Sequence, residues 1–175
     1  MAGECDTEGN IDDGFEIFMV LVNALRAGNW KAAEEFLACH PHAVWAKITA
    51  TGKTALRVAA EAGRLHMVEE LVNYMTAENL EMRHIYGSGF TALAWATSFG
   101  NYRIVKCMLD KNTNLSSIED DSGNIPVVLA LKNGHLELAR YLFLRTPSQI
   151  LMQENGRTGA TVVCEAIYNN ALGKN

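Results

Sequence analysis

Apolar residues in this chain fall into pairs of short segments with helical spacing. Three segments, 65–72, 102–109 and 136–142, place apolar side chains three or four positions apart, and each begins soon after a glycine. A shorter apolar segment precedes each of those glycines. This spacing predicts amphipathic helices with one apolar stripe each. Because such short helices cannot bury their own stripes, we expect neighbouring pairs to stack and to form the core between them.

The helix pairs belong to a sequence repeat. Segments 51–63, 88–100 and 122–134 align without gaps, and two glycines stand eleven residues apart in each. The later glycine recurs at positions 28, 63, 100 and 134, at intervals of 35, 37 and 34 residues. We therefore expect stacked copies of one unit behind an acidic, disordered leader. The expected bounds are 1–14 for the leader and 15–175 for the repeat domain, with copies near 17–49, 50–86, 87–120 and 121–153 and a partial copy over 154–175.

Glycine, threonine and alanine recur where a tight turn would enter a helix. Gly52, Gly89 and Gly123 suit a turn that needs positive φ. Thr54 and Thr91 follow two residues after such a glycine and are suited to cap the next helix. Small residues inside the predicted first helices allow neighbouring helices to approach closely; they are Ala59, Ala60, Ala96 and Ala130.

These features resemble the ankyrin repeat, a tight turn and two antiparallel helices with a period of about 33 residues. Segments 54–56 and 91–93, both Thr-Ala-Leu, stand where that family has its Thr-Pro-Leu-His tetrapeptide, and segment 125–127 keeps the proline. The histidine is replaced by Arg57, Ala94 and Val128. The resemblance covers about residues 18–170. It implies an all-α ankyrin-repeat solenoid of stacked helix-turn-helix units, about 4.5 repeats long, which acts as a non-enzymatic module that binds another protein or peptide.

Two segments resemble one particular group within the ankyrin family. Residues 27–37 and 46–56 are similar to a group of plant ankyrin proteins that carry a membrane domain with a Pro-Gly-Gly motif in the C-terminal half. Members of that group are implicated in defence and stress signalling. Residues 1–175 contain no such domain. The resemblance implies plant defence or stress signalling, with an alternative role as the cytosolic regulatory half of a membrane-anchored sensor or channel-like protein. Because the fifth copy stops at Asn175, we expect a fragment of a longer protein.

Charge and cysteine content limit the other classes of function. The formal net charge is −5, and five acidic residues fall within 1–13, where Lys and Arg are absent. The rest of the chain sums to about zero, which argues against nucleic acid as the main partner. The apolar run 15–25 is too short to span a bilayer, and the N-terminus is acidic where a signal peptide would be basic. With four cysteines far apart, a cytoplasmic location is expected, without membrane contact by this fragment.

Chemical motifs in the chain do not form a matched set. Residues 87–92 match the dinucleotide fingerprint G-x-G-x-x-A, but the preceding segment 80–86 is too polar for a central parallel strand. A nucleotide-binding enzyme is therefore the least favoured alternative. Segment 39–42, Cys-His-Pro-His, lacks a second ligand cluster for a structural metal. We expect no catalytic residues, no cofactor and no metal.

The family binds partners mainly in a concave groove lined by turn tips and first helices. Carried onto this sequence, the groove comprises Arg26, Lys53, Arg57, Glu61, Tyr86, Phe90, Ser98, Phe99, Asn124, Lys132 and Asn133. Phe90 is the first candidate, since exposed aromatic residues are common binding anchors. An alternative is that Phe90 folds back on Trp95 and fills space. Trp95 lies at an apolar position of the repeat and is expected in the core.

The last copy offers a second surface. It carries the apolar residues Val162, Val163 and Ile167, which a complete repeat would cover. End-to-end self-association through this end is therefore a further partner prediction.

Overall fold

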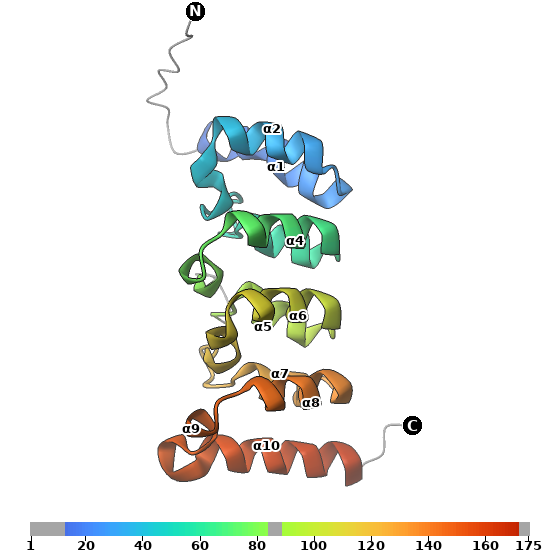
Figure 1. Ribbon diagram of the computed structural model, residues 1–175, viewed down its shortest axis with the longest axis vertical. Coiled ribbons are helices and arrows are strands. Elements are labelled where there is room, and N and C mark those ends of the chain that lie inside the picture. The colour runs from blue at the N-terminus through green and yellow to red at the C-terminus, as the bar shows by residue number, and fades with distance from the viewer. Residues whose placement is uncertain (1–12, 84–88, 172–175) are drawn as a thin grey trace, which may run out of the picture.

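The computed structural model describes residues 13–83 and 89–171, which form a column of stacked helix pairs (Figure 1). Each of the first four repeats contributes two antiparallel α-helices, and the column runs from α1 at one end to α10 at the other. The helices are α1 (Asp13–Ala27) and α2 (Trp30–Cys39), α3 (Ala55–Glu61) and α4 (Leu65–Tyr74), α5 (Ala92–Ser98) and α6 (Tyr102–Lys111), α7 (Pro126–Lys132) and α8 (Leu136–Arg145), then α9 (Ser148–Leu151) and α10 (Gln153–Ala171). The expected all-α solenoid is confirmed.

Short 3₁₀ helices connect the repeats. They are η1 (Pro41–Val44), η2 (Glu78–Glu81) and η3 (Thr113–Ser117). After η1 and after η2 the chain makes one antiparallel bridge at the base of the next turn. Lys47 pairs with Thr54 in the first bridge, and Arg83 pairs with Thr91 in the second. These bridges hold each turn tip in front of the first helix that follows it.

The predicted helix caps are confirmed. The Thr54 hydroxyl accepts a hydrogen bond from the Arg57 amide at 3.3 Å, and the Thr91 hydroxyl accepts one from the Ala94 amide at 3.1 Å. Each bond satisfies an amide that the first turn of a helix leaves without a partner. The third turn uses Ile125 instead and starts its helix with Pro126, whose fixed φ suits that position.

The glycine between the two helices of each pair adopts positive φ. Gly100 is the most constrained, with a φ of 70° and with His135 of the next repeat beside it. A Cβ atom on Gly100 would lie 2.7 Å from Nδ1 of His135, whose Nε2 is 3.1 Å from the Ser98 carbonyl oxygen. Here the absence of a side chain brings two repeats together.

One apolar core runs along the whole column. The predicted alanines are fully buried, so neighbouring first helices pack closely. Large side chains from both helix layers fill the remaining space, among them Leu21, Leu25, Leu56, Met67, Leu71, Leu93, Met108, Leu109, Leu115 and Ile125. Each repeat therefore depends on its neighbours for burial.

The two ends differ from the expected pattern. Helix α1 begins at Asp13, inside the predicted leader, while residues 1–12 lie outside the described part. At the other end, α10 starts at Gln153 and continues through Gly156, where the sequence predicted the turn of a fifth copy. Gly156 keeps a positive φ of 82° within that helix. Helix α10 packs on α7, as a first helix of the next repeat would.

Candidate functional site

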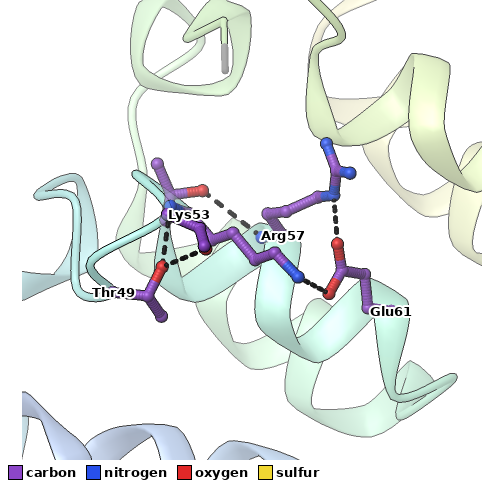
Figure 2. Close-up of polar contacts among 6 residues, drawn as sticks. Thr49, Lys53, Arg57 and Glu61 are labelled. Atoms are coloured by element: carbon purple, nitrogen blue, oxygen red, sulfur yellow. Dashed lines mark hydrogen bonds and ion pairs between the residues drawn. The ribbon is translucent and has the colours of Figure 1, made fainter. Parts of the chain in front are cut away.

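Three of the predicted groove residues form one charged cluster on α3 and the turn before it (Figure 2). Nζ of Lys53 lies 2.7 Å from Oε2 of Glu61, and Nε of Arg57 lies 2.7 Å from Oε1 of the same carboxylate. Arg57 and Glu61 are one helical turn apart, which is the spacing at which side chains meet on a helix. One carboxylate is thus shared by two cations.

The turn before α3 positions Lys53 rigidly. Oγ1 of Thr49 accepts a hydrogen bond from the Lys53 amide at 3.0 Å and lies 3.1 Å from Oγ1 of Thr51. The Lys53 carbonyl oxygen accepts a hydrogen bond from the Ile48 amide at 2.8 Å. Gly52 supplies a φ of 75° at the tip. From this turn the Lys53 side chain reaches along α3 to Glu61 (Figure 2).

Arg57 occupies the position of the missing motif histidine and reaches the next repeat. Its Cζ atom lies 4.9 Å from the centre of the Trp95 ring on α5. Burial lowers the pKa of the Arg57 guanidinium, and the hydrogen bond and charge of Glu61 oppose that shift. Guanidinium stays charged in proteins, so a cation–π contact joins the second and third repeats.

Trp95 and Phe99 form an aromatic platform on α5. Their rings are stacked, with centroids 4.0 Å apart and an interplanar angle of 20°. Phe99 is 61% exposed, while Trp95 is half-buried. The Trp95 ring therefore contacts the Arg57 guanidinium, and the exposed Phe99 ring stacks beside it.

The prediction that Trp95 lies in the core is wrong. Val58 and Leu129 occupy the equivalent position in the neighbouring repeats and are buried. Indole is larger than those side chains, and it stacks on Phe99, one turn away on α5, and against the Arg57 guanidinium. The sequence held a signal for this arrangement, namely two aromatic residues four positions apart on one predicted helix.

Two arrangements of Phe90 were considered from the sequence, an exposed binding anchor and a ring folded back on Trp95, and its exposure is intermediate between them. Phe90 is half-buried and lines a small depression with Gly52, Thr54 and Arg57, so it is less exposed than Phe99. The expected extension of this patch by Tyr86 falls outside the described residues. Of the two phenylalanines predicted for the groove, Phe99 is the more exposed.

The remaining residues predicted for the groove make separate contacts. Nζ of Lys132 donates a hydrogen bond to Oδ1 of Asn124 at 2.7 Å, which repeats the Lys53–Glu61 spacing two repeats further on. Ser98 and Asn133 use their side chains to bond carbonyl oxygens of their own helices. Arg26 is exposed, and its carbonyl oxygen accepts a hydrogen bond from Nε of Arg64.

The Cys-His-Pro-His segment 39–42 and the described part of the dinucleotide fingerprint, residues 89–92, make packing and electrostatic contacts within the repeats. The His40 ring stacks on Phe36 with centroids 4.5 Å apart. Across residues 13–83 and 89–171, no three His, Cys, Asp or Glu side chains are grouped as metal ligands. In the nucleotide fingerprint, Gly89 stands directly against the Asp121 carboxylate, which would repel a phosphate at that glycine.

Among the described helices, none has the length and apolar character needed to cross a bilayer.

Comparison with known proteins places the column in one family. No curated protein matches the chain. A family model described as ankyrin repeats (3 copies) matches residues 21–119 and residues 75–154, which together include all four helix pairs from Leu21 onward. This family indicates a protein–protein interaction module. The chain belongs to the ankyrin-repeat family.

Proposed function

We propose that this chain binds a protein or peptide partner in its concave groove, with Arg57, Trp95 and Phe99 as the central contact. The exposed ring of Phe99, stacked on Trp95, carries the proposal. Exposed aromatic side chains that are held rigidly lose little conformational entropy on binding, and interface hot spots are enriched in Trp, Tyr and Arg.

The charged cluster beside the platform supports a partner with a carboxylate. Lys53 and Arg57 share the single carboxylate of Glu61, so the cluster has one positive charge in excess. An acidic side chain of the partner would be attracted to that excess charge while an adjacent apolar side chain packs on Phe99. Since both cations are already fixed by Glu61, binding would order few further side chains.

Selection of peptides from a random display library tests this proposal. We expect the selected peptides to combine an aromatic or large aliphatic residue with a nearby Asp or Glu. They should lose most of their affinity for Phe99→Ala and for Arg57→Ala, because each change removes part of the proposed central contact. The matched control is Tyr74→Ala, since Tyr74 is exposed on α4 and makes its contact with Glu34.

Peptides that bind both groove variants as tightly as the unchanged chain would contradict the groove assignment. Phe90→Ala provides a graded comparison. Phe90 is half-buried in the neighbouring depression, so we expect a smaller loss of affinity than for Phe99→Ala.

The biological setting is a second, finer proposal. Residues 27–37 and 46–56 are similar to plant ankyrin proteins with a Pro-Gly-Gly membrane domain, which supports a role in plant defence or stress signalling on the cytosolic face of a membrane. The coding sequence of the parent gene tests it. Several apolar stretches of about 20 residues beyond position 175 would support a membrane-anchored protein. A stop codon soon after that position would end this proposal and leave the groove proposal intact.

A further inference from the structure

The small depression beside Phe90 is bounded by two arginines. It lies between the turn before α3 and the turn before α5, and the described residues that line it are Gly52, Thr54, Arg57, Met82, Arg83, Phe90 and Ala92. Arg57 and Arg83 are the charged side chains among them. The volume is about 10 Å³, which is space for about one water-sized group. Two cations from neighbouring repeats thus line a cavity that admits one small polar group.

Arg57 keeps donor groups on the side away from Glu61. Its Nε donates a hydrogen bond to Oε1 of Glu61 at 2.7 Å, and Figure 2 shows its two terminal nitrogens pointing away from that carboxylate. Those two nitrogens carry the other four N–H donors of a guanidinium. Burial lowers the pKa of Arg57, because the charged group has lost part of its hydration. An anion beside the terminal nitrogens would compensate for that loss.

Arg83 enters the same depression from the turn before α5. Its backbone is held by the bridge to Thr91, while its side chain is 47% exposed. Nη1 of Arg83 lies 3.9 Å from Oδ1 of Asp121, which is too long for a hydrogen bond. An exposed ion pair of this kind contributes little to stability. The Arg83 guanidinium can therefore turn to a better placed acceptor at little cost.

The charge around the depression favours an anion. The described charged side chains there are three cations, Lys53, Arg57 and Arg83, and two carboxylates, Glu61 and Asp121. One positive charge is in excess. A carboxylate is flat, and its two oxygens match the fork of a guanidinium. A phosphate group carries its oxygens in more than one plane, so it fits a cavity of this size less well.

We propose that the depression between Arg57 and Arg83 receives an Asp or Glu side chain of the protein partner. This inference rests on the proposed function and says where the partner's acidic group binds. Because Arg57 also contacts Trp95, the depression adjoins the aromatic platform. Helix α5 starts at Ala92, beside the depression, and Phe99 caps its other end, about 10 Å further along the helix axis.

That separation sets a spacing in the partner. An extended peptide advances about 3.3 Å per residue. The acidic residue should therefore stand about three positions from the apolar residue that packs on Phe99. Peptides with this spacing can reach the depression and the platform at the same time.

Acetate tests the depression without any peptide. We expect the side-chain Nε–H resonances of Arg57 and Arg83 in ¹H–¹⁵N spectra to shift and saturate as acetate is added at constant ionic strength. Arg103, which is exposed on α6, is the internal reference and should shift little. In Arg83→Gln, the shift of Arg57 should lose its saturation. Circular dichroism checks that this variant, changed at a partly exposed side chain, keeps its fold.

A double-mutant cycle with a display-selected peptide tests the partner's carboxylate. The peptide has an amidated C-terminus, so that a side chain supplies the carboxylate. Its Asp or Glu is replaced by Asn or Gln, which should weaken binding about tenfold or more, the effect of losing a hydrogen bond to a charged group. Arg83→Gln should weaken the acidic peptide by a similar factor and the amide peptide hardly at all. Arg103→Gln makes the same charge change on α6 and should affect neither peptide.

The other outcomes separate this inference from the proposed function. Acetate shifts that do not saturate, or that are equal at Arg103, would overturn the carboxylate site. So would peptides that depend on Phe99 but whose carboxylate shows no coupling to Arg83, and the proposed function would then stand. An equal loss for acidic and amide peptides in Arg83→Gln would show that Arg83 only shapes the turn. Retained coupling to Arg83 without dependence on Phe99 would support this site and contradict the platform as the central contact.

Discussion

At the residue scale, two positions that depart from the repeat pattern, Arg57 and Trp95, shape the candidate site. Arg57 replaces the motif histidine and makes a cation–π contact with Trp95 instead. Trp95 replaces a medium-sized apolar residue and stacks on Phe99. The caps and turn glycines, by contrast, follow the pattern and fix the turn tips. Residues that follow the repeat pattern fix the turns and helices, and residues that depart from it form the candidate site.

Gly100 provides a stability prediction at this scale. Gly100→Ala should be more destabilising than Gly63→Ala, although both glycines have similar positive φ. The shared left-handed conformation costs an alanine about 1–2 kcal/mol. Only at Gly100 does the new Cβ also meet the His135 ring, whereas nothing lies within 4 Å of it at Gly63. Urea unfolding of the two variants measures the difference, and equal losses would contradict the contact with His135.

The threonine caps provide a second prediction. Thr91→Ala should lower the free energy of unfolding by about 1 kcal/mol, because the Ala94 amide loses its acceptor. Thr91→Ser keeps the hydroxyl and should retain most of the stability. Chemical denaturation distinguishes the two variants. If serine and alanine proved equally destabilising, the loss would come from packing of the threonine methyl group and not from the cap.

Cys107 provides a prediction on chemical reactivity. Burial raises the pKa of its thiol, and the charges of Glu69 and Asp110 raise it further. A higher pKa leaves less of the reactive thiolate at pH 8, so alkylation of Cys107 should be slower than that of exposed Cys39 and Cys164. Its rate should rise as the pH is increased further. Mass spectrometry of a timed iodoacetamide reaction provides the measurement, and equal rates at the three thiols would contradict the burial.

At the scale of elements, the sequence predicted helix positions well because the repeat fixes a register. Glycine intervals set where each helix pair begins, and Thr54 and Thr91 cap the first helices as expected. The sequence predicted burial and helix bounds less well where side-chain size and packing against neighbouring helices determine them. Trp95 stands at a register position that is buried in the neighbouring repeats, yet it is half-buried and stacks on Phe99. Likewise, the start of α10 depends on packing against α7, which no local residue signals.

Two leucines on α8 differ in burial: Leu142 is fully buried, and Leu144 is exposed. Leu142→Ala should cost about 2–5 kcal/mol, because Leu142 is fully buried and its loss leaves a cavity. In the monomer, Leu144→Ala should change stability by less than about 0.5 kcal/mol, because that side chain is exposed. Urea unfolding at low protein concentration measures both. A large loss for Leu144→Ala under these conditions would mean that the side chain is covered within its own copy.

At the scale of the whole molecule, the column places two different surfaces at separate positions. The charged cluster and the aromatic platform lie on α3, on the turn before it and on α5. The end of the column carries an apolar groove between α8 and α10. Because a repeat array transmits contacts mainly between neighbours, a change at one surface should affect the other only weakly.

The three tryptophans allow one measurement to test the central claim, that the partner occupies the groove at Trp95. Trp30 of the first repeat packs against Tyr74 of the second, and Trp45 is exposed after η1, so both lie on other elements than the platform on α5. In ¹H–¹⁵N spectra of the labelled chain, titration with a display-selected peptide should shift the Trp95 indole resonance strongly. The Trp30 and Trp45 indole resonances should stay nearly unchanged. Shifts at Trp30 or Trp45 with Trp95 unaffected would place the partner outside the groove and contradict the account.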